Sequence, residues 1–477
     1  MIVFKWIDRV IIYLLCGRNV IMVMSDDYKE KELLKTNEIS EIQSAADNGD
    51  LIALTELALM YESGKGVNKD IKKAIELYEK ASKGNYAPAL YKLSLLYYNG
   101  IGVDEDREMA ILLCQCAADL KYAPALTLLG KTFRAGEDLP RNYKKAYELF
   151  LLAAKDNFVD AQNALADMYF NGLGTKVNYL EAAKWCTKAA ELGDASGAYN
   201  LAFLYHQGIG VDKNYDAAKK YYEIACAKKN VNAMINLAHM YMNGEGVAED
   251  VGKAINLLKE AVELKSTAAM VRLAEIYYRY KDNGEYLKKA VELFKYAADA
   301  GDNRAKFNLG ILYNIGEGVD KDPVKAAFLW EDAANNGNSE AQMNIASCYE
   351  DGHGVTENFA LAMKYYSMAI ENGVKDAKRR LGFLYCKKGN QSDIPRGIEL
   401  LEDAANNGDK IAQYQLGTIY ENGDDSIKDS LVATKWFKKA ADNGYKYALF
   451  EMAYRYYAGH GVPQHYVNAY IYFLAYK

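Results

Sequence analysis

A residue pattern that recurs every 36 residues runs along almost the whole chain. Its marker is a small residue, and successive markers are 36 residues apart except for one step of 35. The markers are Ala53, Ala89, Ala125, Ala161, Gly197, Ala233, Ala269, Ala305, Ala341, Ala377, Ala412 and Ala448. Self-similarity of this kind is typical of proteins in which each unit buries its apolar face against its neighbours. The sequence therefore predicts one array of about twelve units.

The residues after each marker predict a first helix, called helix A here. An aliphatic residue lies four positions after the marker and an aromatic residue eight positions after it, as with Leu201 and Tyr205. These spacings place both side chains on one face of an α-helix. A glycine such as Gly208 then supplies the left-handed conformation that ends a helix. Tyr280 and Lys388 replace this glycine in two units, so we expect those two turns to differ in shape.

A second helix, helix B, is predicted to follow in each unit. Asp or Asn, which are both good N-caps, stands four residues before the next small residue. These caps are Asp70, Asp106, Asn142, Asn178, Asn214, Asp250, Asp322, Asn358, Asp393 and Asp429. Large apolar residues follow on one side of the helix, which closes with Ala-Ala-x-x-Gly in several units, as at residues 333–337. Each unit is therefore expected to consist of two capped amphipathic helices.

The turn between the two helices usually reads Gly-x-Gly-Val, as at residues 208–211. A Gly-x-Gly motif on its own invites a nucleotide-binding interpretation. Here the motif follows a helix instead of a strand, recurs along the array and lacks both a third glycine and a Gly-Lys-Ser/Thr sequence. We therefore assign these glycines to chain reversal and expect no bound cofactor.

Composition and charge restrict the classes of function. Apolar residues make up 51% of the chain and charged residues 26%, so the chain can bury a large core. The formal net charge is -6, and Lys and Arg are scattered among Asp and Glu. Binding of nucleic acid needs a local positive surface. We therefore expect protein partners and no nucleic acid.

The seven cysteines show no disulfide framework and no metal-binding spacing. Cys114 and Cys116 are two residues apart, which places them on different faces of a helix. Free buried thiols favour a reducing compartment. The sequence therefore predicts a cytoplasmic protein, with secretion as the alternative if residues 1–24 act as a signal.

The N-terminus differs in composition from the array. Residues 1–24 contain an apolar run from Val10 to Cys16 that is too short to span a bilayer, and Arg18 interrupts the apolar region that a signal peptide needs. We interpret residues 1–24 as an apolar extension, with translation starting at Met24 as one explanation. Residues 25–48 are predicted to form a capping helix region. Residues 49–477 are predicted to be the tandem repeats, the last one incomplete, with no transmembrane span.

The repeat pattern resembles the Sel-one-like repeat, a relative of the tetratricopeptide repeat. The motif Ala-x-x-x-Leu-Gly-x-x-Tyr-x-x-Gly-x-Gly-Val-x-x-Asp-x-x-x-Ala stands almost whole between Ala305 and Ala326, and the resemblance covers residues 40–477. It implies an all-α, right-handed α/α superhelical solenoid with helix A on the inner face and helix B on the outer face. It also implies an adaptor in protein complexes. Some secreted relatives carry a disulfide in each repeat, but only Cys114 and Cys186 share a repeat position here.

No set of side chains stands out from the repeat as a catalytic or metal site. His206 and His239 fall on helix A of adjacent units and form the one pairing that could approach for metal binding, while His353 and His460 occupy variable turn positions. We expect no catalytic residue, no metal and no enzymatic activity. The alternative from another class is a hydrolase acting on a cell-wall or glycan substrate, and a secreted host-interaction factor is a further alternative.

The inner surface of the predicted solenoid is the candidate binding site. If helix A lines the concave face, its positions outside the core can contact an extended or helical segment of a partner protein. The candidate residues are Asn163, Asp167, Phe170, Tyr199, Phe203, His206, Ile235, His239, Met242, Tyr278, Arg279, Phe307 and Asn314. The chain also stops inside an apolar helix B rich in aromatic residues, which predicts either that the chain is truncated or that its C-terminal end self-associates or binds a partner.

Overall fold

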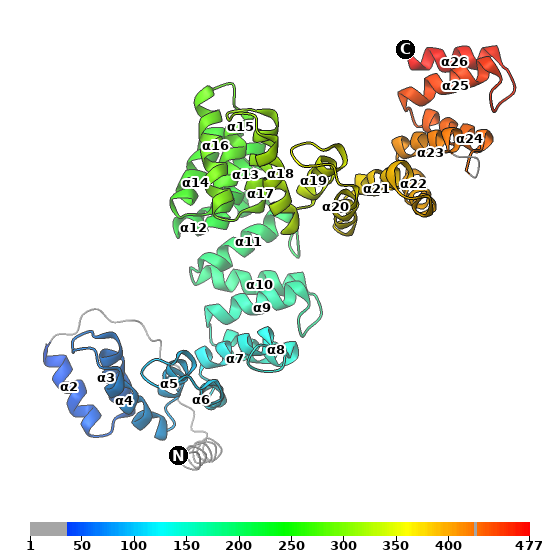
Figure 1. Ribbon diagram of the computed structural model, residues 1–477. Helices are drawn as coiled ribbons and strands as arrows, with labels where there is room; N and C mark the ends of the chain where they lie inside the picture. Colours follow the sequence, from blue (N-terminus) through cyan, green and yellow to red (C-terminus); the bar gives the residue numbers. More distant parts are fainter. Residues whose placement is uncertain (1–35, 424–426) are drawn as a thin grey trace. The chain divides into compact units, whose positions relative to one another are not determined.

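The computed structural model describes residues 36–423 and 427–477 of the chain (Figure 1). The predicted extension at residues 1–24 lies outside the described residues, as does the start of the predicted capping region. Within the described residues every regular element is helical and there is no strand. The predicted all-α fold is therefore confirmed.

The chain divides into two compact units, Met1–Leu257 and Leu258–Lys477. In the first unit each helix from α2 to α13 packs against the next one, and helices A and B alternate from α3 onward (Figure 1). Its helices are α2 (Thr36–Asp47), α3 (Leu51–Ser63), α4 (Ile71–Lys83), α5 (Ala87–Asn99), α6 (Arg107–Asp119), α7 (Ala123–Ala135), α8 (Tyr143–Lys155), α9 (Val159–Asn171), α10 (Tyr179–Glu191), α11 (Ala195–Gln207), α12 (Tyr215–Ala227) and α13 (Val231–Asn243), with α14 (Val251–Glu263) containing the boundary.

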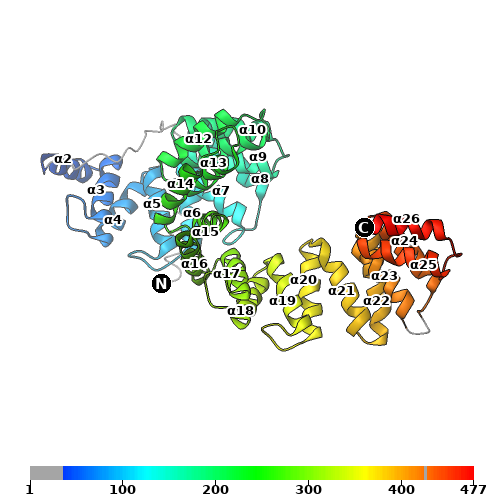
Figure 2. The same cartoon turned by 90° about the horizontal axis from the view of Figure 1, so that it is seen from above.

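The second unit continues the same alternation. Figure 2 shows the succession of packed helices from α19 to α26 in yellow to red. The helices are α15 (Thr267–Arg279), α16 (Gly284–Asp299), α17 (Asn303–Ile315), α18 (Pro323–Asn335), α19 (Ser339–Asp351), α20 (Phe359–Glu371), α21 (Lys375–Lys388), the short 3-10 helix η1 (Gln391–Asp393), α22 (Ile394–Asn406), α23 (Lys410–Asn422), α24 (Ser430–Asp442), α25 (Lys446–Ala458) and α26 (Tyr466–Tyr476).

Nine of the ten predicted caps begin a helix B. In α18, for example, the Asp322 side chain accepts a hydrogen bond from the Lys325 backbone N–H at 3.0 Å. The prediction for Asp393 is wrong: it makes no cap hydrogen bond to α22 and instead ends η1, where its carboxylate accepts from the Asn390 backbone N–H at 2.9 Å. Lys388 stands where most repeats have a glycine, and α21 extends to this residue. The 3-10 helix η1 that follows directs the Asp393 carboxylate back to Asn390.

The glycine after helix A adopts the left-handed conformation, with a φ of 72° at Gly208. The two turns without this glycine differ, as predicted: α15 ends at Tyr280 with a φ of -106°, and α21 extends to Lys388. The prediction is wrong at Gly423, which has a φ of -64° and is extended. The turn after Gly423 therefore leaves helix A by a different backbone path.

The second glycine of the Gly-x-Gly turn has a separate role, which is close packing between repeats. A Cβ at Gly354 would lie 2.1 Å from the carbonyl oxygen of Pro323, the first residue of helix B in the preceding repeat. A Cβ at Gly210 would similarly lie 2.4 Å from the backbone of Tyr179. No side chain fits at such a distance, so this glycine allows each turn to pack against helix B of the preceding repeat.

The core of each repeat lies between its own two helices. Helix B contributes a large side chain, such as Phe150 or Trp330, that is almost fully buried. Helix A contributes the small residue beside its aliphatic position: a Cβ at Gly310 would lie 2.5 Å from the Trp330 ring, and one at Gly130 would lie 2.7 Å from Phe150. The small residue beside the aliphatic position therefore allows helix A to approach the ring.

Candidate interaction surfaces

Nine of the predicted partner-binding residues lie on three successive helices A of the first unit. They are Asn163, Asp167 and Phe170 on α9, Tyr199, Phe203 and His206 on α11, and Ile235, His239 and Met242 on α13. Asp167 and His239 are exposed, His206 is buried, and the other six are half-buried. Several of these side chains therefore already contact the protein itself.

The residue two positions after the marker binds the start of helix A in the next repeat. The Asn163 side-chain amide donates to Asp194, the N-cap residue of α11, at 2.8 Å. In the second unit the Arg379 guanidinium pairs with Asp409, the N-cap of α23, at 3.0 Å. The same position therefore joins consecutive repeats with different chemistry, and Asn163 is only partly available to a ligand.

A second recurring contact joins the residue nine positions after the marker to the middle residue of the next repeat's Gly-x-Gly turn. His206 Nε2 lies 2.7 Å from a Glu245 carboxylate oxygen, and the Tyr278 hydroxyl donates to Glu317 at 2.7 Å. Asn314 repeats the geometry, with its Oδ1 2.8 Å from His353 Nε2. We call these pairs the inter-repeat clasps.

The clasp at Glu245 brings together the two histidines singled out in the sequence. His239 Nδ1 lies 3.5 Å from the same carboxylate oxygen that contacts His206. Burial acts to raise the pKa of Glu245, but the hydrogen bond from His206 and the charges of His239 and His206 lower it below its usual value overall. Across the residues that the structure describes, no group of three or more His, Cys, Asp or Glu side chains is placed to hold a metal ion.

The four remaining predicted residues lie in the second unit. Tyr278 contacts Glu317 and Lys281, and Asn314 contacts His353, so both take part in local hydrogen bonds. Phe307 packs against a buried cluster, and its carbonyl accepts a hydrogen bond from Trp330 Nε1 at 3.1 Å. Arg279 is exposed. Whether any of these residues contacts a partner stays a prediction.

The thiols of the described residues are free, with no disulfide among them. Burial raises the pKa of Cys114 and of Cys186 to about 12. Such thiols are almost entirely protonated near neutral pH and are therefore weak nucleophiles. None of the described helices is long and apolar enough to cross a membrane.

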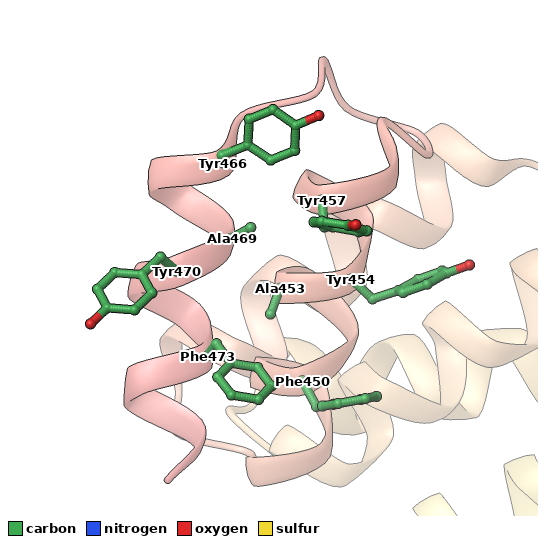
Figure 3. Close-up of a pocket in the computed structure, with 8 residues that line it drawn as sticks. All are labelled: Phe450, Ala453, Tyr454, Tyr457, Tyr466, Ala469, Tyr470 and Phe473. Carbon is green, nitrogen blue, oxygen red and sulfur yellow. The ribbon is translucent and has the colours of Figure 1, made fainter.

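An exposed aromatic groove lies between α25 and α26. Figure 3 shows its lining side chains on both helices, with the small Ala453 and Ala469 between the aromatic rings. The groove is lined by Phe450, Ala453, Tyr454, Tyr457, Tyr466, Ala469, Tyr470 and Phe473. No charged residue lines it.

Helix α25 also carries a buried arginine. Arg455 on α25 is 1% exposed and pairs with Glu421 and, at 3.0 Å, with Glu451. It also donates to the Thr434 hydroxyl at 2.7 Å, and its guanidinium lies 4.7 Å from the Phe437 ring centre. Every polar group around Arg455 therefore serves to compensate its buried charge.

Sequence reasoning missed both the clasps and the buried arginine. The clasps carry a detectable signal, because complementary polar residues recur 39 positions apart, as for His206 and Glu245. Arg455 carries a clearer one: the other eleven repeats have an uncharged residue at this position, such as Met168 or Leu312. A charged residue in a core position requires partners close by.

Two capped helices per repeat, stacked on their neighbours through recurring contacts, define an α-solenoid repeat protein. The model of the Sel1 repeat family matches twelve consecutive segments of the chain: residues 51–86, 87–122, 123–158, 159–194, 195–230, 231–266, 267–302, 303–338, 339–374, 375–409, 410–445 and 446–475. The chain therefore belongs to the Sel1 repeat family. Among curated proteins, none matches this chain.

The chain is similar to solved structures of repeat proteins. A protective antigen of uropathogenic Escherichia coli that displays the Sel1-like repeat fold is 28% identical, with a TM-score of 0.62, over 91% of this chain and 86% of that one. A Sel1 repeat protein from Oxalobacter formigenes is 21% identical, with a TM-score of 0.42, over 78% of this chain and 99% of that one. The first of these supports the solenoid fold over most of the chain.

Proposed function

We propose that the chain is a non-catalytic scaffold that binds a segment of another protein along helices A of its first unit. The observation that carries this proposal is the mixed surface of α9, α11 and α13. At the position six residues after the marker these helices present Asp167, Phe203 and His239, of which the first and last are exposed. Met242 adds a half-buried apolar side chain nearby in the sequence. Apolar side chains supply affinity for a peptide and polar ones fix its register.

The contacts of the ionisable side chains support a non-catalytic role. His206 and Glu245 form one of a series of clasps between repeats, in which histidine, tyrosine, asparagine and glutamate occupy equivalent places. A contact that recurs with interchangeable chemistry serves packing. A catalytic site needs defined groups held in one geometry.

Photo-crosslinking from defined positions tests the binding surface. A benzoylphenylalanine would replace Asp167 or His239 on helix A or, as a matched control, the exposed Leu180 on helix B. We expect one protein to crosslink from positions 167 and 239 and not from 180. Capture from position 239 should fall when Phe203→Ala is added, with the helical circular dichroism unchanged. Equal crosslinking from all three positions, or none from 167 and 239, would remove the proposal.

Two expectations from the sequence enter the proposal as well. We propose that the protein works in a reducing compartment such as the cytoplasm, which the free buried thiols Cys114 and Cys186 support. Recovery of the protein in the extracellular fraction of its native cells would contradict this. Self-association at the C-terminal end is a separate proposal, carried by the exposed side chains of α25 and α26.

A further inference from the structure

The groove between α25 and α26 corresponds to the surface by which the other repeats pack against the next repeat. Helix B carries a large side chain four residues after its small residue in all repeats except two, which have Cys114 and Cys186 there. In α24 and α20 this side chain is Phe437 or Tyr366, and at most 3% of it is exposed. In α26 the equivalent residue is Phe473, which is 43% exposed. The position that forms the core elsewhere is therefore open here.

Neighbouring positions show the same difference. Tyr470 in α26 is 64% exposed, whereas its equivalent in α18, Ala327, is fully buried. Phe450 in α25 is about half exposed, whereas its equivalent in α23, Tyr414, packs against the ring of Tyr445 in the next repeat at 5.1 Å between centroids. The groove therefore consists of side chains in positions that another protein surface covers elsewhere in the array.

The chemistry of the groove favours a covering surface that is itself aromatic. Internal interfaces use polar or aromatic partners at two positions of helix A: Asn163–Asp194 and His206–Glu245 are polar pairs, whereas Tyr414 packs on Tyr445. In α25 these two positions hold Phe450 and Tyr457, so a charged side chain of a partner would find no oppositely charged residue in the groove. Aromatic side chains pack favourably on one another in offset or edge-to-face geometry.

The N-terminal end of the described array offers no matching surface. Helix α2 exposes Glu41, Ser44 and Asp47. Packing the Glu41 and Asp47 carboxylates on the aromatic groove would remove charged groups from water against a surface that has no charged residue, which is unfavourable. A contact between the C-terminal end of one copy and the N-terminal end of another is therefore disfavoured, whereas a contact between two C-terminal ends pairs like surfaces.

The area of the groove is sufficient for a dimer. Six aromatic side chains line it, at 43% to 64% exposure. With about 150–250 Å² for each buried aromatic side chain, they can bury roughly 500–800 Å² in each copy. Two copies would then bury about 1,000–1,600 Å², which overlaps the about 1,200–2,000 Å² of specific interfaces. Exposed Val467 and Ile471 on α26 extend the apolar surface further.

We propose that the α25–α26 groove binds the same groove of a second copy of this chain, giving a two-fold symmetric dimer. Phe450, Tyr454, Tyr470 and Phe473 form the centre of the contact. The interaction uses none of the residues that bind the partner segment in the proposed function, so each proposal can fail without the other.

Sedimentation equilibrium of the full chain tests the dimer. The mass is measured from about 1 to 100 µM, because interfaces of this size bind with micromolar or tighter dissociation constants. We expect the mass to rise from 53.4 kDa to a limit of twice this value. Tyr470→Glu and, separately, Tyr454→Glu should each weaken the dimer about thirtyfold, as expected when a charge replaces a central aromatic residue. Phe328→Glu, at a 69% exposed position on α18, is the control and should leave the dimer unchanged.

Each other outcome overturns the proposal. A mass of one chain at every concentration means that the groove does not bind itself. A mass that grows past two copies indicates contact between opposite ends, which does not close. A dimer that survives both Tyr470→Glu and Tyr454→Glu, with circular dichroism showing folded variants, forms elsewhere. Loss of the dimer with Phe328→Glu as well would show a non-specific effect of charge.

Discussion

The buried ion pair of Arg455 permits a quantitative test of what holds the last repeat in place. Arg455 is almost fully buried, whereas Glu421 keeps 20% of its side chain exposed and belongs to the preceding repeat. Removing one partner of a buried pair costs about 3–5 kcal/mol because the other charge stays buried and unpaired. Glu451 still pairs with Arg455 at 3.0 Å after such a change. We therefore expect Glu421→Gln to destabilise this repeat by about 1–3 kcal/mol, below that full cost.

Arg455→Met is the matched comparison. Three other repeats have methionine at this position, Met60, Met168 and Met240, and all three are buried. Replacing a buried charge by an apolar residue of similar volume is often neutral or stabilising. We expect Arg455→Met to change stability by less than about 1 kcal/mol, and Glu421→Gln to have little further effect in that background.

Hydrogen exchange of the backbone amides of α25 and α26 measures both effects. A terminal repeat of a solenoid can open without the rest of the array, so its exchange reports its own stability. Glu421→Gln should speed exchange there and leave α3 to α13 unchanged. The reasoning is refuted if Glu421→Gln has no effect, or if Arg455→Met destabilises these helices as much as Glu421→Gln does.

The same ion pair predicts a dependence on pH. Burial acts to raise the pKa of Glu421, but hydrogen bonds from His460 and Arg455 lower it below its usual value overall. A carboxyl group with a lowered pKa in the folded state contributes stability above its ordinary pKa, and this contribution is lost as pH falls. Exchange of α25 and α26 should therefore speed up as pH falls below about 4.5, the ordinary pKa, and less so in Glu421→Gln, after correction for intrinsic exchange.

Three further predictions concern the array. Gly354→Ala should lower the thermal midpoint much more than Gly337→Ala. Both glycines have a positive φ, but only a Cβ at Gly354 would contact the Pro323 carbonyl oxygen, at 2.1 Å. Equal shifts would contradict the role of the second turn glycine. Cys114 and Cys186 have pKa values of about 12, so alkylation at pH 8, followed by peptide mass spectrometry, should label them roughly a thousandfold more slowly than an ordinary thiol. Rapid labelling of the folded protein would refute their burial. Gln413→Met should cost about 0.5–1.5 kcal/mol in urea unfolding, since it removes the 2.8 Å hydrogen bond to the Ala405 carbonyl, which keeps the Gly408 backbone N–H as a donor at 3.2 Å; an unchanged midpoint would show that this side-chain hydrogen bond adds no net stability.

Most of the fold follows from the sequence because the period is long and strict. The small marker, the aliphatic and aromatic positions of helix A and the cap of helix B each have a local physical cause, so they can be assigned without a structure. The two wrong predictions concern Asp393 and Gly423. Both residues lie in turns, after α21 and α23, that lack the Gly-x-Gly motif. There the backbone path depends on extra or missing residues, and a motif taken from other repeats does not determine it.

The candidate site could be predicted only in part. Sequence spacing correctly places Asp167, Phe203 and His239 on helices A, because helical periodicity alone fixes their face. It could not show that Asn163 and His206 are engaged in contacts between repeats, since those depend on how one repeat seats on the next. Contacts between repeats are tertiary, and their partners are about 30 to 40 residues away in the sequence.

The contacts between repeats also limit where binding specificity can reside. The positions two and nine residues after the marker join neighbouring repeats, as Asn163 and His206 do, so a change there alters the packing of the array as well as its surface. The position six residues after the marker varies in chemistry, from Asp167 through Phe203 to His239. Its polar side chains form ion pairs at the surface, such as Asp167 with Arg134 at 3.0 Å and His239 with Glu245 at 3.5 Å. Exposed pairs of this kind contribute little to stability, so residues at this position can change without loss of the fold. Differences in partner choice among such arrays should therefore arise mainly at this position, and the described contacts explain why the rest of helix A is less free to vary.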